Sequence, residues 1–426
     1  MLRTRRTVAG VMAVALTAAL AACGAAPEPV TTSPRPTQSA TPGPAFEPGD
    51  GVLTIGTLFP TTGAQAFISP AQRAGVDLAI GEINKAGGVL GQPVVAVHAD
   101  SGEAKTKKAE SSYASLVKKG ADVIIGPSSS VLAERILPLA IRDRVPLISP
   151  AATAPRLSGL ADAGMLFRTV PSAALQGSVL ARLASGDEQI RLAVVYFDDD
   201  TGRATLATAT ATVAELGGRL VSSQKVTSAT KKVDGLVAAV KASKPDAVIL
   251  ATPFSAMTQN KAIIAGLTKA GLGHERLWFI SANLADYSQA LPAGMLLGAR
   301  GVIPGAEPNK AFRDRVKAAG KNVKDYRYSA EAYDATMLAA LAAIVAGNDN
   351  SEAVAASLVD VSAGGIKCVG LAECLDVLHT QSDIDYDGVS GPVNLSQEGD
   401  PSPAHYGLYK YDKANKFARV DRVVGN

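Results

Sequence analysis

Small residues with hydroxyl groups follow two expected strands in the first third of the chain. Residues 126–130 (Gly-Pro-Ser-Ser-Ser) follow the strand expected at 123–125 and lead into an amphipathic helix. Backbone N–H groups at a helix N-terminus, together with serine hydroxyls, can bind an anion without a lysine or arginine. Alternatively, one serine only caps the helix. Residues 149–153 (Ser-Pro-Ala-Ala-Thr) follow the next strand and would let a ligand approach the backbone.

The chain lacks the short motifs that mark common catalytic sites. It has no G-x-S-x-G elbow, no G-x-x-x-x-G-K-[ST] loop, no H-E-x-x-H pair and no G-x-G-x-x-G after a strand. The four histidines are too widely spaced for a short metal-binding motif, although distant residues could still assemble a site: His98, His274, His379 and His405. We therefore expect no enzyme activity, no metal and no cofactor.

Residues 383–388 copy the start of a calcium-binding loop, with aspartates at alternate positions before Gly388. That loop requires a bidentate glutamate at its twelfth position, where this chain has Asn394, and Pro392 disfavours a following helix. We interpret the segment as a turn that uses aspartate side chains.

The first 22 residues have the organisation of a secretory signal peptide. Arginines at positions 3, 5 and 6 precede an apolar run at 8–20, and small residues lead to Cys23. A permanent membrane-spanning helix is an alternative, but the run is short for that role. The residues around Cys23 (Leu-Ala-Ala-Cys-Gly) resemble the bacterial lipoprotein signal, in which the cysteine becomes the lipidated first residue. An ordinary secreted protein with a stray thiol is the other alternative.

A segment rich in proline follows the expected lipidation site. Residues 24–50 contain seven prolines among small and polar residues, too little apolar surface to offset the entropy of ordering. We therefore predict a disordered tether at 23–50 that joins the lipid to a globular body.

The two remaining cysteines, Cys368 and Cys374, lie six positions apart. Thiols this close in an exported chain are expected to form a structural disulfide. Thiol catalysis, the alternative, would require a partnered histidine that the sequence does not place. We predict a Cys368–Cys374 disulfide that fastens a surface segment.

From residue 51 onward, β-rich runs alternate with helical patterns, which is typical of an α/β fold with parallel sheets. The first unit has strands expected at 53–58, 94–98, 123–125 and 147–148, and helices at 70–86, 103–119 and 130–142. A similar unit follows, with strands at 192–197, 220–225, 247–250 and 277–280, and helices at 203–216, 233–242 and 256–270. Ligands bind beyond the carboxyl ends of such strands, so two facing units would form a cleft.

Composition agrees with this organisation. A length of 426 residues, 47% of them hydrophobic, indicates two or three domains with substantial cores. Three of the 42 basic residues lie in the signal segment, which leaves 39 against 39 acidic residues. Because the charges balance and only 5% of residues are aromatic, the body lacks the basic surface of a nucleic-acid-binding protein.

Residues 52–426 resemble the type I periplasmic binding proteins, specifically the leucine/isoleucine/valine-binding receptors of ABC transporters. The most specific segments are 75–88 (GVDLAIGEINKAGG), 125–130 (IGPSSS), 148–157 (ISPAATAPRL) and 385–392 (DYDGVSGP). The resemblance implies two Rossmann-like lobes joined by three hinge crossings, with ligand trapped as the lobes close. We place the first lobe at 51–171 plus about 303–395, and the second at 172–302 plus about 396–426.

The resemblance also implies ligand contacts in the first lobe. By position, Ser130, with Ser129 beside it, and Thr153 would hold a ligand carboxylate. The Ala151 carbonyl would accept a hydrogen bond from a ligand amino group.

Other expected contacts involve side chains from both lobes. Phe67 or Ile68 would contact the ligand side chain. In the second lobe, Thr201 stands where the family often has tyrosine, and Phe254 falls near a family aromatic position. Asn283 stands where an acidic residue often pairs with the ligand ammonium, so we expect a ligand with a carboxylate or amide end and no α-ammonium group.

The function implied is that of a solute-binding lipoprotein on the outer face of the bacterial cytoplasmic membrane. It would capture a small carboxylate or amide compound and deliver it to ABC permease subunits. A sensor lipoprotein that signals to a membrane partner would use the same lobe closure and is the alternative. We expect a monomer that contacts the membrane only through its lipid and binds no nucleic acid.

The predicted lipidation of Cys23 can be tested by replacing its thiol. Cys23→Ala should shed the protein from membranes or leave its signal peptide uncleaved, because the lipid supplies the anchor. Membrane fractionation with mass spectrometry of the N-terminal peptide measures both outcomes. A cleaved variant that stays on the membrane would contradict the prediction.

Overall fold

The computed structural model describes residues 46–63, 65–186, 188–305, 308–380 and 383–425. The predicted signal peptide, Cys23 and residues 24–45 of the predicted tether lie outside the described residues. Residues 46–50, which we expected to belong to the tether, are instead held by the body. The Gly49 N–H donates to Asn348 Oδ1 over 3.0 Å, and the Gly51 N–H donates to Asp349 Oδ2 over 2.8 Å.

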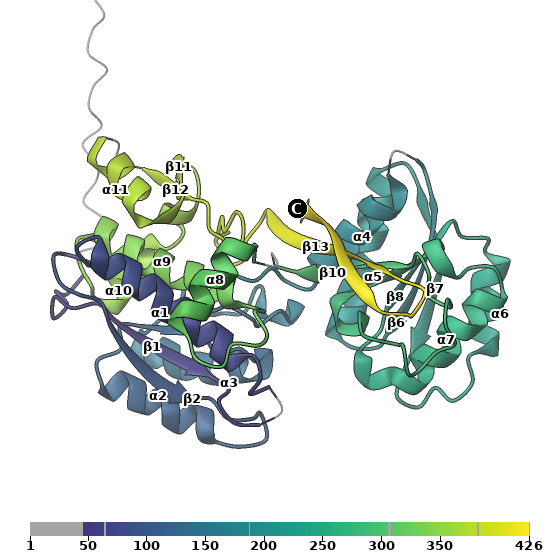
Figure 1. Cartoon of the computed structure of the whole chain (residues 1–426), viewed down its shortest axis with the longest axis horizontal. Coiled ribbons are helices and arrows are strands. Elements are labelled where there is room, and N and C mark those ends of the chain that lie inside the picture. Colours follow the sequence, from purple (N-terminus) through teal and green to yellow (C-terminus); the bar gives the residue numbers. More distant parts are fainter. Residues whose placement is uncertain (1–45, 64, 187, 306–307, 381–382, 426) are drawn as a thin grey trace, which may run out of the picture. The chain divides into compact units, whose positions relative to one another are not determined.

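The first sheet has five parallel strands in the order β2-β1-β3-β4-β5 (Figure 1). These strands are β1 (Thr54–Phe59), β2 (Val95–Asp100), β3 (Val123–Ile125), β4 (Leu147–Ser149) and β5 (Leu166–Arg168). One face packs against α2 (Lys108–Lys118) and α3 (Ser130–Asp143), and the other against α1 (Ser69–Lys85) and α9 (Ser329–Ala346). The central strands are therefore buried on both faces, which explains their runs of branched apolar residues.

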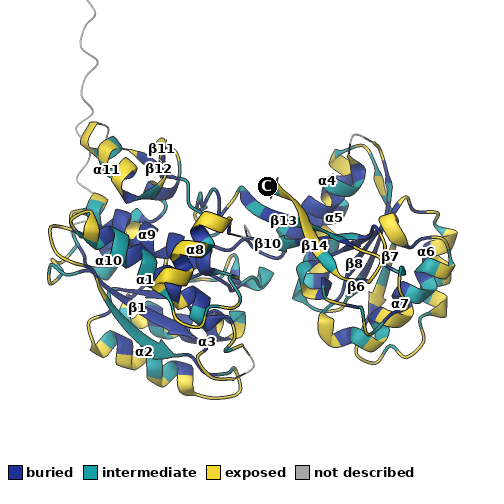
Figure 2. Cartoon of the chain, in the orientation of Figure 1, coloured by how far each residue is buried: buried dark blue, intermediate teal, exposed yellow. Residues whose placement is uncertain are grey.

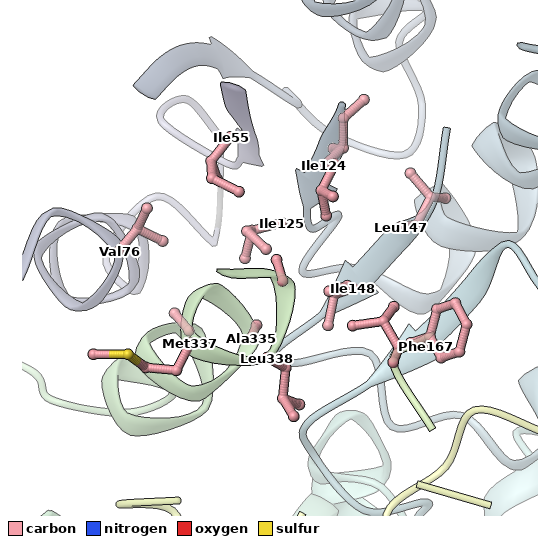
Figure 3. Close-up of a cluster of buried hydrophobic side chains, with 14 of the residues drawn as sticks. Ile55, Val76, Ile124, Ile125, Leu147, Ile148, Phe167, Ala335, Met337 and Leu338 are labelled. Atoms are coloured by element: carbon pink, nitrogen blue, oxygen red, sulfur yellow. The ribbon is translucent and has the colours of Figure 1, made fainter. Parts of the chain in front are cut away.

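The core of the first sheet forms where α9 meets β3 and β4. Leu338 of α9 is fully buried in the same cluster as Ile124 and Ile148 (Figure 3). Among the described helices, α9 is the one long and apolar enough to cross a membrane, but 83% of it is buried inside the molecule. Since it packs against the sheet, we interpret α9 as a core helix.

The second sheet has seven strands in the order β14-β13-β10-β9-β8-β6-β7. These strands are β6 (Arg191–Phe197), β7 (Arg219–Val226), β8 (Ala247–Ala251), β9 (Leu277–Phe279), β10 (Arg300–Pro304), β13 (Ala404–Tyr411) and β14 (Phe417–Gly425). The pairs β10–β13 and β13–β14 are antiparallel, and the other neighbours are parallel.

Helices cover both faces of the second sheet. One face packs against α4 (Leu175–Ser185) and α5 (Asp200–Glu215), and the other against α6 (Asp234–Ala242) and α7 (Met257–Lys269). Alternate residues of β6 enter opposite cores: Leu192 packs on the α4/α5 side and Ala193 on the α6/α7 side. The buried strands and the exposed outer faces of the helices are visible in Figure 2.

The structure confirms the predicted α/β class and the strands expected in both units. Two helix starts differ clearly. The helix expected at 103–119 begins only at Lys108. Residues before it form turns, because Asp100 Oδ1 accepts from the Gly102 N–H over 2.9 Å and the Thr106 hydroxyl donates to the Glu103 carbonyl over 2.9 Å. Conversely, α5 begins at Asp200, earlier than expected, because the Asp199 side chain caps it by accepting from the Gly202 N–H.

The chain passes between the two sheets three times. It leaves the first sheet after β5 to enter α4, and it returns after β10 to α8 (Lys310–Ala319), which packs against α1. It leaves again after β12 (Ile384–Tyr386) to enter β13. The described residues from Phe46 onward group as one compact unit, and the lobe bounds given above stay a prediction.

The first two turns of α9 contact all three crossings. The Thr169 hydroxyl of the first crossing donates to the Glu331 carbonyl over 2.7 Å. Gly305 of the second crossing lies so close that a Cβ there would stand 2.0 Å from Glu331 Oε1. Asp334 accepts from the N–H groups of Val389 and Ser390, at 2.9 and 2.7 Å, at the start of the third crossing.

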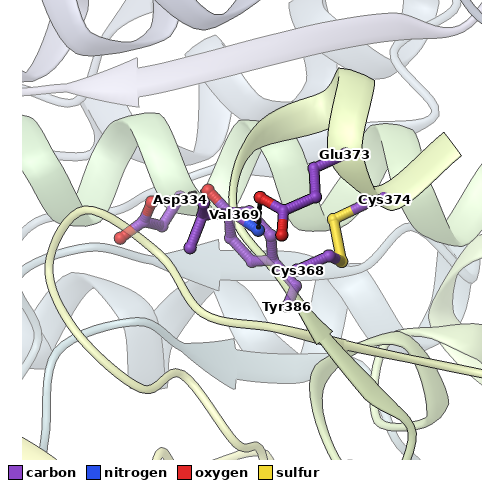
Figure 4. The surroundings of a disulfide bond; sticks show 6 residues. All are labelled: Asp334, Cys368, Val369, Glu373, Cys374 and Tyr386. Carbon is purple, nitrogen blue, oxygen red and sulfur yellow. Dashed lines mark hydrogen bonds between the residues drawn. A yellow bond between two sulfur atoms is a disulfide. The ribbon is translucent and has the colours of Figure 1, made fainter. Parts of the chain in front are cut away.

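A small unit beside α9 carries the predicted disulfide. It consists of β11 (Ile366–Cys368), α11 (Gly370–Thr380) and β12, and α10 (Ser351–Ser357) also packs against α9. The Cys368–Cys374 disulfide is present, with Val369 N–H donating to Glu373 Oε2 beside it over 3.2 Å (Figure 4). The cysteines themselves are buried, while Val369 between them is 60% exposed.

The aspartate-rich segment forms the predicted turn. Gly388 and Gly391 exchange backbone hydrogen bonds, and Asp385 and Asp387 pair with the Lys367 ammonium at 3.4 and 3.0 Å. Among the described residues, no cluster of His, Cys, Asp or Glu is arranged to hold a metal ion.

Replacing Glu331 should change how stability depends on pH. Burial raises the pKa of this carboxyl to about 8, whereas an unfolded glutamate titrates near its ordinary value of 4.5. The wild type therefore loses stability as the pH rises from about 4.5 towards 8. Glu331→Gln, which mimics the protonated acid, should gain on the order of 2–4 kcal/mol over the wild type by pH 8 and little at pH 4.

Thermal unfolding between pH 4 and 8 measures this difference. The exposed Glu188 offers a control, because Glu188→Gln should follow the wild-type curve. A Glu331→Gln advantage that is constant or shrinks with rising pH would contradict the prediction.

Candidate ligand-binding site

Two loops at the carboxyl edge of the first sheet form the core of the site. β3 and β4 are parallel neighbours, with Ile124 opposite Leu147, so the residues that follow them come together. Gly126 makes the first turn possible: its φ is +123°, and a Cβ there would stand 2.5 Å from the Leu58 carbonyl oxygen. The Ser149 hydroxyl then ties the loops together by donating to the Pro127 carbonyl over 2.6 Å.

Ser130 and Thr153, predicted to bind the same ligand end, lie on these adjoining loops. Ser130 Oγ accepts a hydrogen bond from the Ala154 N–H over 3.1 Å. A hydroxyl that accepts one hydrogen bond keeps its own proton to donate, and a carboxylate is a suitable acceptor. The Thr153 side chain is half-buried. The backbone carbonyl of Thr153 accepts a hydrogen bond from the Ala173 N–H over 2.8 Å. Ala151 lies on the same loop and is 9% exposed.

The start of α3 favours an anion. Ser129 is the N-cap residue, with extended backbone, but its side chain makes no capping hydrogen bond. The Ser129 side chain therefore does not cap the helix, which was the alternative considered from the sequence. The first turn of α3 contains no acidic residue, so the partial positive charge of the helix N-terminus is not neutralised there.

Sequence reasoning missed Gln72 of α1. This side chain is fully buried, and its Oε1 accepts from the Ser128 hydroxyl over 2.7 Å. Its Nε2 is buried without a hydrogen-bond partner among the described residues. No sequence signal marked it, since glutamine is common on the helices that cover a sheet.

The two residues expected to contact a ligand side chain differ in exposure. Ile68 is 5% exposed, whereas Phe67 is 53% exposed. The Arg327 guanidinium lies 5.0 Å from the centre of the Phe67 ring, within cation–π range. The structure therefore offers Phe67, more than Ile68, as an accessible apolar contact.

On the second sheet, two predicted residues follow strand ends and are accessible. Thr201 lies half-buried in the first turn of α5, after β6. Phe254 begins the short 3₁₀ helix η2 (Phe254–Ala256) after β8, and it is 53% exposed.

Asn283, in contrast, is fully buried in a network of side chains. Its Oδ1 accepts from Asn260 Nδ2 over 2.9 Å and from the Tyr287 hydroxyl, and its Nδ2 donates to Thr252 Oγ1 over 2.9 Å. Burial raises the pKa of Tyr287, so its hydroxyl keeps the proton that it donates. A direct ligand contact by Asn283 remains a prediction, and it would require this network to open.

The acidic groups near these loops are paired with arginines. Arg156, in the 3₁₀ helix η1 (Pro155–Leu157), pairs with Glu134 at 2.8 Å and with Asp200 at 3.2 Å. Arg203 pairs with Asp200 and with Asp198, both at 2.9 Å, and this hydrogen bond lowers the pKa of Asp198. A ligand ammonium would have to compete with guanidinium groups for each of these three carboxylates.

Comparison with known families identifies the family of this chain. A sequence profile described as periplasmic binding protein matches residues 52–399. The chain belongs to the periplasmic binding protein family. This family binds solutes and is non-enzymatic, which confirms the predicted family and the prediction that the chain is not an enzyme.

Two curated relatives of this periplasmic binding protein cover most of both chains. The chemotactic signal transduction system substrate-binding protein BasB of Halobacterium salinarum is 29% identical over 82% of this chain and 84% of its own length. The Leu/Ile/Val-binding protein BraC3 of Rhizobium johnstonii is 27% identical over 84% of this chain and 92% of its own length.

Solved structures share the fold. A substrate-binding protein of Desulfitobacterium hafniense in complex with Leu covers 87% of this chain and 100% of its own, with a TM-score of 0.64 and 20% identity. A solute-binding protein of R. palustris in complex with 4-hydroxybenzoate covers 88% and 97%, with a TM-score of 0.62 and 18% identity. The two sheets therefore have the arrangement of the type I periplasmic binding protein fold.

The predicted role of Ser130 can be tested by removing its hydroxyl. Ser130→Ala should weaken ligand binding about tenfold to a hundredfold, because it loses a charge-assisted hydrogen bond of about 1.5–3 kcal/mol. Calorimetry with the compound released from the purified, denatured protein measures the affinity. Ser111→Ala, an exposed serine on α2, is the control and should bind as the wild type does. Unchanged affinity in Ser130→Ala would remove Ser130 from the site.

Proposed function

We propose that this protein is an extracytoplasmic receptor, anchored by lipid at Cys23, that delivers a small solute to an ABC permease. It acts as a monomer and closes its two lobes around the solute. The ligand carries a carboxylate or amide end and no α-ammonium group. Small hydroxy, keto or aromatic acids and short amides fit this description.

The proposed ligand class rests on one observation: donors are available at the carboxyl edge of the first sheet, whereas the polar groups of the second sheet are already paired. The first-sheet loops offer donors, namely the Ser130 hydroxyl and the start of α3. On the second sheet, Asn283 is sealed in its network and Asp200 is held by two arginines. An anionic or neutral ligand end finds partners here, whereas an ammonium group would lose its hydration without a dedicated carboxylate.

Solved structures with this fold hold ligands of both kinds, with and without an ammonium group. One solved structure holds Leu and another holds 4-hydroxybenzoate, so this fold accommodates ligands with and without an ammonium group. For this chain, the pairing of its own acidic residues with arginines favours a ligand without an ammonium group.

Signalling is a second candidate function, favoured by one relative. The curated relative from Halobacterium salinarum is described as a chemotactic substrate-binding protein. Reconstitution separates the two functions: delivery predicts that the liganded protein stimulates ATP hydrolysis by its permease in liposomes, whereas a pure sensor leaves that rate unchanged.

A matched pair of ligands tests the ligand class. Leucine and 4-methyl-2-oxopentanoate share one carbon skeleton and differ in the ammonium group, and benzoate and benzamide differ in charge. The acids without ammonium should raise the unfolding temperature by several degrees, since ligand at 100 times its dissociation constant stabilises by about 2.7 kcal/mol. Leucine should cause little shift.

Thermal-shift measurements with calorimetry read out this comparison. Ser130→Ala is the site control and should reduce every genuine shift. Binding of a branched-chain amino acid by the wild type at micromolar affinity or better would overturn the proposed ligand class.

A further inference from the structure

Arg168 is a buried arginine whose donors are all used inside the protein. It ends β5, just before the first crossing, and is 1% exposed. Its Nε and Nη2 donate to the two oxygens of Asp400, both at 2.5 Å, and Nη2 also donates to Ser158 Oγ over 2.7 Å. Its Nη1 donates to the Ala152 and Ala154 carbonyls, both at 3.1 Å. These five bonds satisfy the five N–H groups of a guanidinium.

The two carbonyls lie on either side of Thr153. Holding the Ala152 carbonyl fixes the peptide plane before Thr153, and holding the Ala154 carbonyl fixes the plane that follows the next residue. The same short segment is held at two further points, because the Ala154 N–H donates to Ser130 Oγ and the Thr153 carbonyl accepts from the Ala173 N–H. The segment at 152–154 is thus held by Arg168, by the Ser130 hydroxyl and by the first crossing.

Asp400 connects the same loop to the third crossing. It lies between β12 and β13, and its Oδ2 also accepts from the Ser158 hydroxyl over 2.5 Å. A cavity of about 220 Å³ borders Asp400 and is lined by residues of the first and third crossings, including Ser172 and Pro401. In this part of the crossing the Asp400 side chain acts together with backbone hydrogen bonds, because the Arg168 N–H donates to the Gly399 carbonyl over 2.8 Å and the Ser402 N–H donates to the Asn394 carbonyl over 2.9 Å.

We infer that Arg168, clamped by Asp400, is a positioning residue that sets ligand affinity through Thr153. The inference rests on the proposed function, in which Thr153 contacts the ligand. By holding residues 152–154 to the third crossing, the pair also makes the ligand loop and the hinge move as one body.

Arg168→Lys tests the inference while it keeps the positive charge. An ammonium has three donors and cannot hold both carbonyls and both carboxylate oxygens at once. Arg142, which makes a similar two-pronged pair with Asp143 on the exposed surface, offers the matched control Arg142→Lys.

Hydrogen exchange of the ligand-free protein is the first readout. In Arg168→Lys, the amides of Ala152 and Ala154 should exchange tenfold or more faster than in the wild type. The amides of Ile124 and Gly126, bonded within the first sheet, should keep their rates. Wild-type rates at residues 152–154 would overturn the inference whether or not a ligand is known.

Binding of 4-methyl-2-oxopentanoate and benzoate is the second readout, in a double-mutant cycle with Thr153→Ala. Arg168→Lys alone should weaken binding tenfold or more at unchanged stoichiometry, and it should cost little once Thr153→Ala is present. Additive losses would show that Arg168 does not act through Thr153. If the wild type binds neither probe, the proposed ligand class fails, and hydrogen exchange alone decides the positioning role.

A milder variant keeps the test valid if Arg168→Lys does not fold. Ser158→Ala removes only the hydroxyl that joins Arg168 to Asp400. It should produce a smaller acceleration of exchange at the same two amides, and no acceleration there would count against the clamp.

Discussion

The buried carboxylate of Asp334 constrains where the chain can leave the first sheet. A carboxylate removed from water must be met by hydrogen-bond donors, or its burial costs several kcal/mol. The Tyr386 hydroxyl, the Val389 N–H and both the N–H and hydroxyl of Ser390 supply them. Burial raises the pKa of Asp334 to about 6, so at neutral pH the ionised form depends on these donors. The segment that starts the third crossing therefore cannot leave α9 without stranding this charge.

The Arg168–Asp400 pair applies the same constraint at the far end of that segment. Asp400 is tied to β5, the Ser402 N–H donates to the Asn394 carbonyl over 2.9 Å, and β13 begins at Ala404, so few residues of the third crossing remain to change direction between the sheets. In the first crossing, Thr169 is tied to α9 and the Ala173 N–H to Thr153, while α4 begins at Leu175. The flexible part of each of these two crossings is thus a few residues long, and it adjoins the second sheet. Such short hinges favour rigid-body movement of the two sides.

Local pattern was enough to predict four strands of each sheet and the loops at their edges, but not β5, β10, β13 or β14. Strands buried on both faces, such as β3, have a continuous apolar run, and residues 126–130 and 149–153 follow such runs directly. The partners of Arg168 could not be predicted, because Asp400 lies 232 positions away and ion pairs leave no spacing pattern. The sequence offered one indication of a buried ion pair, a single arginine directly after the apolar residues Leu166 and Phe167. Asn283 was placed by family position, but its enclosure by Thr252, Asn260 and Tyr287 depends on three further elements that only the folded chain brings together.

The asymmetry of the two sides bears on how the receptor selects its ligand. The first side presents N–H and O–H donors, which attract a carboxylate or carbonyl oxygen. On the second side, an ammonium group that binds Asp200 must compete with Arg156 and Arg203, which already stand 3.2 and 2.9 Å from its oxygens. That exchange replaces one ion pair with another and adds the cost of dehydrating the ammonium, so it yields little net free energy. A ligand without the ammonium group avoids the exchange, and the arginine pairs can stay formed as it binds.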